Sequence, residues 1–425
     1  MRSLAEWLAF IERQHPASVA LGLDRVSKVF ERMAIAIAFP VITVGGTNGK
    51  GSTCAMLEGI LLAAGYRVGC YTSPHLLRFN ERARIDGREA TDAELVAQLE
   101  AVEAARGETS LTYFEFTTLA ILRLFGEWPL DALVLEVGLG GRLDAVNIVD
   151  ADCAVLTSID VDHADFLGDS RERIGWEKAH VMRPGRPAIC SDPEPPESVV
   201  DHAQAIGADL RRFGRDFSHT GDRLQWAWAG RSQRYGGLAY PALRGANQLL
   251  NASGVLAALE AVREQLPVTA RDVRRGFAGL ALPGRFQVLP GRPVVVLDVA
   301  HNPHAAAHLA RNLESMGFFR RTWAVFGMLA DKDVDAVIAH MKPLVNRWIC
   351  CSLPGPRGGD AQWLAGRLHA AGVSGGDAAD PGVACVPTAA DGLALARERA
   401  GQNDRIVVFG SFLTVADALA GGRNA

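Results

Sequence analysis

The stretch Gly45-Gly46-Thr47-Asn48-Gly49-Lys50-Gly51-Ser52-Thr53 decides the fold of this 425-residue chain. It follows a β-branched run, Val41 to Val44, and precedes a helical pattern from Ser52 to Ala64 that ends at Gly65. A glycine-rich turn between a strand and a helix lets backbone N–H groups approach a phosphate, and the helix N-terminus adds positive potential. Lys50 supplies a cation for the terminal phosphate. The stretch therefore predicts a phosphate-binding loop in an α/β domain.

The loop departs from the general P-loop pattern at two positions. The first glycine of its pattern lies four residues before Gly49 instead of five, and Gly51 stands where Ser or Thr is usual. A glycine turn without a ligand is the alternative, but strand, lysine and helix all coincide here.

Apolar runs beyond the loop indicate further parallel strands. Asp131 to Val137 and Cys153 to Ile159 are almost continuously apolar, as expected of strands covered on both faces. A second alternation of strands and helices begins after Pro283-Gly284. We therefore expect an α/β protein with a P-loop parallel-sheet domain and a smaller Rossmann-like α/β domain. The predicted domains are residues 1–285, with a small β-rich insert at about 212–245, and residues 286–425.

Composition excludes several classes of protein. The 44 basic and 48 acidic residues give a net charge of −4, which argues against a nucleic-acid binder. The longest mainly apolar stretch, 34–44, is too short for a membrane span and contains Pro40. Seven cysteines, an odd number, with no signal-peptide pattern at the N-terminus, fit reduced thiols. We expect a cytoplasmic protein without nucleic-acid or membrane partners.

Three polar residues follow predicted strands and are candidates for a metal–phosphate site. Ser73 follows the strand after the loop helix, Glu136 lies within the end of the run at 131–137, and His163 follows the run at 153–159. In open parallel sheets, ligands bind outside the carboxyl ends of the strands. The alternatives are a capping serine, a glutamate paired with Arg142 and a histidine at the core edge.

At this level of detail the chain resembles the Mur ligase superfamily, whose variant loop is GTNGKGST (46–53). Within it, the chain resembles the bacterial dihydrofolate synthase/folylpolyglutamate synthase family. The matching segments are LGLDRV (21–26), TSPHLLRFNER (72–82), EVGLGGRLDAVN (136–147), TSIDVDHADFLG (157–168), LPGRFQVL (282–289), LDVAHNPHA (297–305), FGMLADKD (326–333) and FGSFLTV (409–415).

The resemblance implies ATP and two Mg²⁺ ions as cofactors and allows a monovalent cation. It implies an ATP site of Thr47, Asn48, Gly49, Lys50, Gly51, Ser52, Asn251, Arg285 and Asp298. It assigns the metal site to Ser73, Glu136, His163 and Lys178, and the catalytic roles to Lys50, Lys178, His163 and Arg285.

Lys178 is implied to carry a CO₂-derived carbamate. Only five of the 44 basic residues are lysines, so a retained lysine suggests a need for an amine. A carbamate turns a cation into an oxygen ligand that Mg²⁺ accepts. The alternative is an ordinary solvated lysine on a helix.

The resemblance also implies a pterin site and an amino-acid site. Its pterin contacts would be Ser18, Val19, Ala20, Leu21, Thr112, Tyr113, Phe114, Glu115, Leu143, Asp144 and Ala145. The amino-acid contacts would be His301 and Asn302. Tyr113 and Phe114 could stack on a flat ring, but without the resemblance, aromatic residues at the start of a helix are more often core residues.

The implied reaction is ATP-dependent ligation of L-glutamate to 7,8-dihydropteroate and to reduced folates, through an acyl phosphate, by a monomer. The alternatives are a folylpolyglutamate synthase alone, a UDP-muramoyl amino-acid ligase, and a regulatory NTPase that makes no product. The first domain leaves little room for a separate UDP-binding domain, because the loop begins by residue 45.

Overall fold

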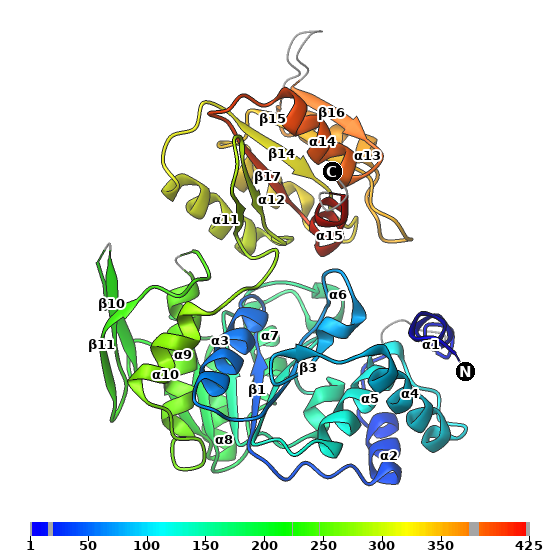
Figure 1. Ribbon diagram of the computed structural model, residues 1–425, viewed down its shortest axis with the longest axis vertical. Helices are drawn as coiled ribbons and strands as arrows, with labels where there is room; N and C mark the ends of the chain where they lie inside the picture. Colours follow the sequence, from blue (N-terminus) through cyan, green and yellow to red (C-terminus); the bar gives the residue numbers. More distant parts are fainter. Residues whose placement is uncertain (1, 16–19, 223, 246, 374–381, 422–425) are drawn as a thin grey trace. The chain divides into compact units, whose positions relative to one another are not determined.

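The computed structural model describes residues 2–15, 20–222, 224–245, 247–373 and 382–421. They form two compact units, one of residues 1–242 and 248–280 and the other of residues 243–247 and 281–425 (Figure 1). Each unit is built around its own sheet. Ser18 and Val19, two of the predicted pterin contacts, lie outside the described residues.

Within the described part of the first unit, the main sheet has eight strands in the order β4-β3-β2-β5-β1-β6-β7-β8. Their bounds are β1 Val41–Gly45, β2 Val68–Tyr71, β3 Ala83–Ile85, β4 Arg88–Glu89, β5 Ala132–Glu136, β6 Cys153–Leu156, β7 Pro187–Cys190 and β8 Asp209–Arg212. Strands β2 to β8 of this order run parallel, and β3 and β4 add an antiparallel edge. Every residue of β1, β5 and β6 is buried, as their apolar runs predict.

Helices cover both faces of this sheet. Their bounds are α1 Leu4–Ile11, α2 Asp24–Met33, α3 Lys50–Ala63, α4 Asp92–Arg106, α5 Tyr113–Glu127, α6 Ala164–Leu167, α7 Arg171–Ala179, α8 Glu197–Ile206, α9 Asn247–Ala261 and α10 Ala270–Ala278, with 3₁₀ turns η1 Phe79–Arg82 and η2 Ala145–Ile148. Helices α1, α2, α4 and α5 share one apolar core with β1, β2 and β5. Helix α3, which starts at Lys50, packs against the same strands and against α10.

The insert after β8 is a separate three-stranded antiparallel sheet within the described residues. Its strands are β9 Ser218–Gly221, β10 Gln225–Ala229 and β11 Arg234–Ala239, in the order β11-β10-β9. Trp226 and Trp228 of β10 are buried, and the Trp228 indole donates to the Ser253 carbonyl of α9 at 3.1 Å. The small sheet therefore stands against α9 and α10 (Figure 1).

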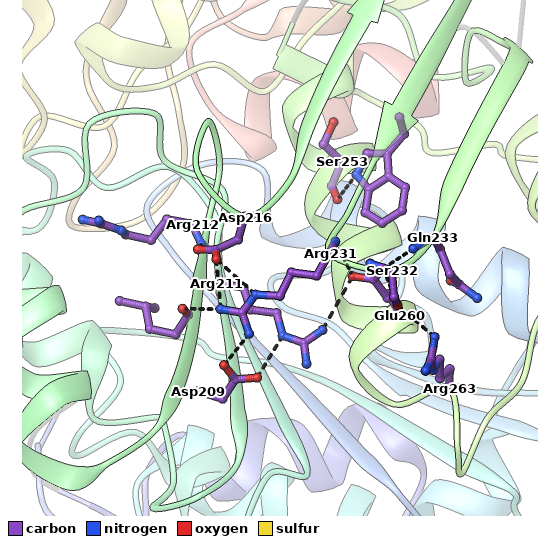
Figure 2. A network of polar contacts seen from close by, with 12 residues as sticks. Asp209, Arg211, Arg212, Asp216, Arg231, Ser232, Gln233, Ser253, Glu260 and Arg263 are labelled. Carbon is purple, nitrogen blue, oxygen red and sulfur yellow. Dashed lines mark hydrogen bonds and ion pairs between the residues drawn. The ribbon is translucent and has the colours of Figure 1, made fainter.

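A buried carboxylate fixes the β10–β11 turn to α9 (Figure 2). Glu260 accepts hydrogen bonds from the backbone N–H groups of Arg231, Ser232 and Gln233 at 3.2, 2.8 and 2.7 Å. The Ser232 hydroxyl adds a fourth at 3.0 Å, and Arg211 lies 3.7 Å from the same carboxylate. One side chain thus satisfies donors that the turn would otherwise leave unpaired.

The described residues of the second unit contain a six-stranded sheet, in the order β12-β13-β17-β14-β15-β16. Its strands are β12 Gln287–Leu289, β13 Val294–Leu297, β14 Thr322–Phe326, β15 Arg347–Cys351, β16 Val383–Val386 and β17 Arg405–Phe409. Its helices are α11 Pro303–Ser315, α12 Val334–Met341, α13 Ala361–Ala370, α14 Ala389–Arg399 and α15 Phe412–Gly421. All pairings are parallel except β12 with β13. The α/β class, with a parallel-sheet first unit and a smaller second one, is confirmed.

No helix in the described part of the chain is both long enough and apolar enough to cross a bilayer.

We expect Glu260→Ala to destabilise the protein by about 3 kcal/mol, because it leaves three backbone donors without an acceptor and removes one of the two carboxylates beside Arg211. The midpoint of urea unfolding, followed by tryptophan fluorescence, measures this. Glu264→Ala is the control, since Glu264 is exposed just beyond α9 and should shift the midpoint little. Equal midpoints for the two variants would contradict the anchoring role of Glu260.

Candidate active site

The phosphate loop runs so close to its neighbours that side chains are excluded at two positions. At Gly46, with φ of +138°, an added Cβ would lie 1.8 Å from the Thr157 hydroxyl oxygen. At Gly49, with φ of +94°, it would lie 2.6 Å from Oδ1 of Asn251. Both glycines are therefore required by space and by backbone conformation.

The loop is tied to the segment that follows β6. Thr47 Oγ1 donates to the Asp160 carbonyl at 2.9 Å and accepts from the Asp160 N–H at 3.0 Å. The Thr47 N–H donates to the Ser158 carbonyl at 2.7 Å, and the Ser158 hydroxyl donates to the Asn48 carbonyl at 3.1 Å. These contacts hold the loop in shape before any ligand arrives.

Two lysines from different elements converge on one backbone oxygen. Lys50 Nζ donates to the Gly46 carbonyl at 3.1 Å and to the Thr47 carbonyl at 3.2 Å. Lys178 Nζ, from α7, donates to the same Gly46 carbonyl at 2.9 Å. Lys178 is buried, which excludes the alternative of a solvated lysine. Burial and the neighbouring Lys50 cation lower the pKa of Lys178 to about 7, against the opposing pull of Asp162 and Asp144.

Ser73 and Glu136 lie together at the ends of adjacent parallel strands. The backbone N–H of Ser73 donates to the buried Glu136 carboxylate at 3.1 Å. Arg142, the alternative partner for Glu136, instead pairs with Glu177 at 2.9 Å. His163 is the exposed N-cap residue of α6, with φ of +53°, and its Nε2 is 4.0 Å from Asp162.

No group of three or more His, Cys, Asp and Glu side chains that could hold a metal occurs among the described residues. A divalent ion at this strand end would therefore depend on donors beyond that set, such as the hydroxyl of Ser73 or a modified Lys178.

The side chain of Asn251, predicted to bind adenine, lies beside the loop at Gly49. Its amide donates to Gln248 at 3.1 Å, and Gln248 in turn contacts the Ser52 hydroxyl at 3.4 Å. Gln248 and Asn251 at the start of α9 thus lie against the start of α3. Gly51 belongs to the first turn of α3.

The predicted pterin contacts at 112–115 begin α5 with a capping box. Thr112 Oγ1 accepts from the Glu115 N–H at 3.3 Å, and Glu115 accepts from the Thr112 N–H at 2.7 Å. The other Glu115 oxygen pairs with Arg25 at 2.9 Å, and Arg25 also donates to the Ala20 carbonyl at 2.8 Å. Glu115 therefore orders the segment at 20–25, which includes the exposed Leu21.

The aromatic residues of this segment lie in two different settings. Phe114 stacks on Tyr71 with ring centroids 6.2 Å apart, whereas Tyr113 meets Phe79 edge-on at 6.4 Å. The Arg82 guanidinium lies over the Phe79 ring at 5.4 Å and the Tyr113 ring at 5.7 Å.

His75 adjoins this group. Its Nδ1 accepts a hydrogen bond from Nε of Arg82 at 2.9 Å. Burial and the Arg82 cation lower the pKa of His75 to about 4, so the ring is neutral near pH 7.

Asp144, between the predicted contacts Leu143 and Ala145, organises the loop after β5. Its carboxylate accepts from the N–H groups of Leu139 at 2.8 Å and Val146 at 2.9 Å. Burial raises the pKa of Asp144 to about 6, although these backbone donors and the Lys50 cation oppose the shift.

In the second unit, Arg285 and Asp298 are neighbours. The Arg285 guanidinium lies 4.8 Å above the Phe412 ring. Asp298 accepts from the N–H groups of Phe286 and Ala300, both at 2.8 Å. Burial raises the pKa of Asp298, and Arg285 opposes that shift.

The two predicted amino-acid contacts also carry local roles. Asn302 is the N-cap of α11, where its side-chain oxygen accepts from the Ala305 N–H at 2.9 Å. Nδ1 of His301 is 2.8 Å from the Val299 carbonyl.

Sequence reasoning missed Gln248, Ser158, Asp160 and Arg82. Gln248 lies one helical turn before Asn251, a spacing that signals a shared face. Ser158 and Asp160 belong to the quoted TSIDVDHADFLG segment, which by resemblance predicts a role only for His163. Arg82 ends the quoted TSPHLLRFNER segment, but Arg78 lies in the same segment, so the motif alone does not single out Arg82.

Comparisons with known proteins identify the family of the chain. The Mur ligase middle domain matches residues 44–231, and the Mur ligase glutamate ligase domain matches residues 284–412. The dihydrofolate synthase/folylpolyglutamate synthase of Escherichia coli K12 is 44% identical over 417 residues, which cover 98% of this chain and 94% of that protein. The chain belongs to this family of Mur ligases.

Solved structures extend the likeness to the fold. E. coli FolC in complex with DHPP and ADP has a TM-score of 0.93 at 43% identity, with 100% of this chain and 99% of that chain covered. A bifunctional folylpolyglutamate synthase/dihydrofolate synthase with Mn, AMPPNP and L-glutamate bound has a TM-score of 0.91 at 43% identity, covering 100% and 98%. As a Mur ligase, the chain is an ATP-dependent ligase.

We expect Gly46→Ala to destabilise this Mur ligase by about 3 kcal/mol and to abolish ATP binding, because the new Cβ meets the Thr157 hydroxyl. Urea unfolding and calorimetric titration with ATP measure the two effects. Gly236→Ala, where a Cβ meets nothing within 4 Å, is the control.

The pair Gly46→Ala/Thr157→Ala should recover part of the stability that Gly46→Ala loses, because the clashing hydroxyl is gone. Strictly additive losses would show that the contact with Thr157 is not what excludes a side chain at Gly46.

Proposed function

We propose that this ligase joins L-glutamate to 7,8-dihydropteroate and to reduced folyl-glutamates through an acyl phosphate. The observation that carries the proposal is the convergence of Lys50 and Lys178 on the Gly46 carbonyl in a pre-shaped phosphate loop. Similarity to bifunctional relatives over almost the whole chain supports the two acceptor acids.

The proposed reaction needs no protein nucleophile. The acceptor carboxylate takes the γ-phosphoryl group of ATP, the glutamate amine attacks the acyl carbon, and phosphate leaves. The loop from Thr47 to Ser52 positions the phosphates, and Lys50 leaves its carbonyl contacts to neutralise their charge. Asn251 lies beside Gly49 and is proposed to face the base.

Glu136 and Ser73 fit a divalent cation, because a carboxylate and a hydroxyl oxygen meet at one strand end. We propose that His163 and a carbamate on Lys178 complete the donors for two Mg²⁺ ions. Bound metal would neutralise charge on the transferred phosphoryl group.

The carbamate is favoured by the setting of Lys178. A neutral amine attacks CO₂, forming an N–C bond and releasing one proton. Because the pKa of Lys178 is about 7, the neutral amine is abundant near neutral pH. Carbamylation would turn Lys178 into an anion, so that a negative and a positive group, instead of two amines, would lie beside the Gly46 carbonyl. The carbamate would also add an oxygen ligand where few acidic side chains gather.

In the second unit, we propose that Arg285 and Asp298 serve ATP and that His301 and Asn302 serve L-glutamate. Arg285 is held over Phe412 and is suited to neutralising phosphate. The residues at 112–115 and 143–145, with the segment at 20–21, are proposed to surround the pterin. We further propose a cytoplasmic monomer.

We expect the purified protein, given ATP, Mg²⁺ and L-glutamate, to release phosphate with either dihydropteroate or tetrahydrofolate as the second substrate. Mass spectrometry of the products should show one added glutamate on each acid. Product with tetrahydrofolate alone would reduce the proposal to a folylpolyglutamate synthase. Phosphate release indifferent to both acids would favour a regulatory NTPase, and turnover only with a UDP-muramoyl acid would favour a cell-wall ligase.

We expect Lys178→Arg to lower kcat by at least about 100-fold, because a guanidinium keeps the charge but forms no carbamate. Wild-type enzyme stripped of CO₂ at pH 6 should regain activity on adding bicarbonate. At equal dissolved CO₂, recovery should be faster at pH 8 than at pH 6.5, since the neutral amine increases through its pKa of about 7. Carbon-13 NMR with labelled bicarbonate tests for the carbamate directly. Lys342→Arg, at the end of α12, is the matched control. A fully active Lys178→Arg enzyme would exclude the modification from the mechanism.

A further inference from the structure

Arg82 and Arg84 lie two residues apart and differ in their charged partners. Arg84 is paired with the buried Glu58, whose carboxylate it contacts through Nη2 at 2.7 Å and Nε at 2.9 Å. Arg82 is also buried, with 9% of its surface exposed, but no carboxylate pairs with it among the described residues.

The contacts of Arg82 orient its side chain but leave its charge uncompensated. Its Nε donates to Nδ1 of the His75 ring at 2.9 Å, and Phe79 and Tyr113 lie against its guanidinium. Within the described residues, no hydrogen bond from its two terminal nitrogens is found. A buried guanidinium without an anion is costly, and its terminal nitrogens match the two oxygens of a carboxylate.

Arg82 lies between the phosphate end and the aromatic end of the proposed acceptor site. Its backbone carbonyl accepts from the Thr72 N–H at 3.0 Å, one residue before Ser73 and its contact with Glu136. Its guanidinium reaches Tyr113 on the other side and is close enough to Tyr71 to act on its pKa. A carboxylate on Arg82 would thus lie near the reacting end of an acceptor acid.

We propose that Arg82 binds the carboxylate of a folyl-glutamate that does not react. This inference rests on the proposed function and specifies how one site takes two acids. Dihydropteroate has a single carboxylate, which must accept the phosphoryl group, whereas the glutamate of a folate carries two. A guanidinium clamp on the reacting carboxylate would weaken it as a nucleophile, while the same clamp on its neighbour fixes which of the two reacts.

Arg82→Gln tests the proposal by the ratio of two activities of one enzyme. The specificity constant for tetrahydrofolate should fall by roughly 100-fold, mainly through KM, as expected when one partner of a buried charge pair is removed. The loss with dihydropteroate should be at least tenfold smaller, and this second activity also reports that the variant is folded. Arg82→Lys should recover little, because it restores charge without the fork.

A folate analogue whose non-reacting carboxylate is an amide provides the reciprocal test. Wild-type enzyme should lose about as much with this analogue as Arg82→Gln loses with the natural folate. Combining variant and analogue should cost little more than either change alone, because both remove the same contact. Arg78→Gln is the matched control, since Arg78 is exposed in the same segment and pairs with Glu89.

Equal losses with dihydropteroate and tetrahydrofolate would overturn the proposal and assign Arg82 to the reacting carboxylate or to the fold. Strictly additive effects of variant and analogue would also overturn it, as would a change confined to the KM of L-glutamate. A wild-type enzyme without activity on either acid would instead refute the proposed function.

Discussion

The contact between Gly46 and Thr157 is the constraint on which the rest of the site depends. The ends of β1 and β6 come so close that no Cβ fits at Gly46. The loop can then hydrogen bond to the segment at 157–160, and the Gly46 carbonyl is turned toward α7. The N–H donors of a phosphate loop usually receive the attention, because they bind the phosphate. In this loop the Gly46 carbonyl is equally important, because both Lys50 and Lys178 donate to it.

That arrangement has an electrostatic consequence. Two ammonium groups on one carbonyl repel each other, and in a buried setting water screens this little. Lys178 is the more deeply buried of the two amines, and its pKa is lowered to about 7. Asp144 shifts in the opposite direction, to about 6, for the same reason of burial. Both pKa shifts favour the neutral form of the side chain. Charged ligands such as phosphates and metal ions would therefore offset each other's charge here more than these two side chains do.

The sequence predicted the strands and the loop well because these depend on local patterns. Buried parallel strands need unbroken apolar runs, and 131–137 and 153–159 have them. The sequence predicted side-chain roles less completely, because the same residue type can bind a ligand or stabilise the fold. Glu115 and Asn302 were singled out as ligand contacts, and both cap helices. Capping competes for the same oxygen atoms as ligand binding, so a motif alone does not separate the two.

Arginine 82 illustrates the remaining limit of sequence reasoning. Nothing in the residues 78–84 distinguishes an arginine paired within the fold from one that is not, because the partner Glu58 lies far away in sequence. The division between lysine and arginine is more readable. Arginine suits Arg82 and Arg285, whose planar groups lie against aromatic rings while they keep a permanent charge. Lysine suits position 178 if it carries the proposed carbamate, because an amine that has lost its proton can react with CO₂. In a chain with only five lysines, the proposed carbamate would account for lysine instead of arginine at position 178.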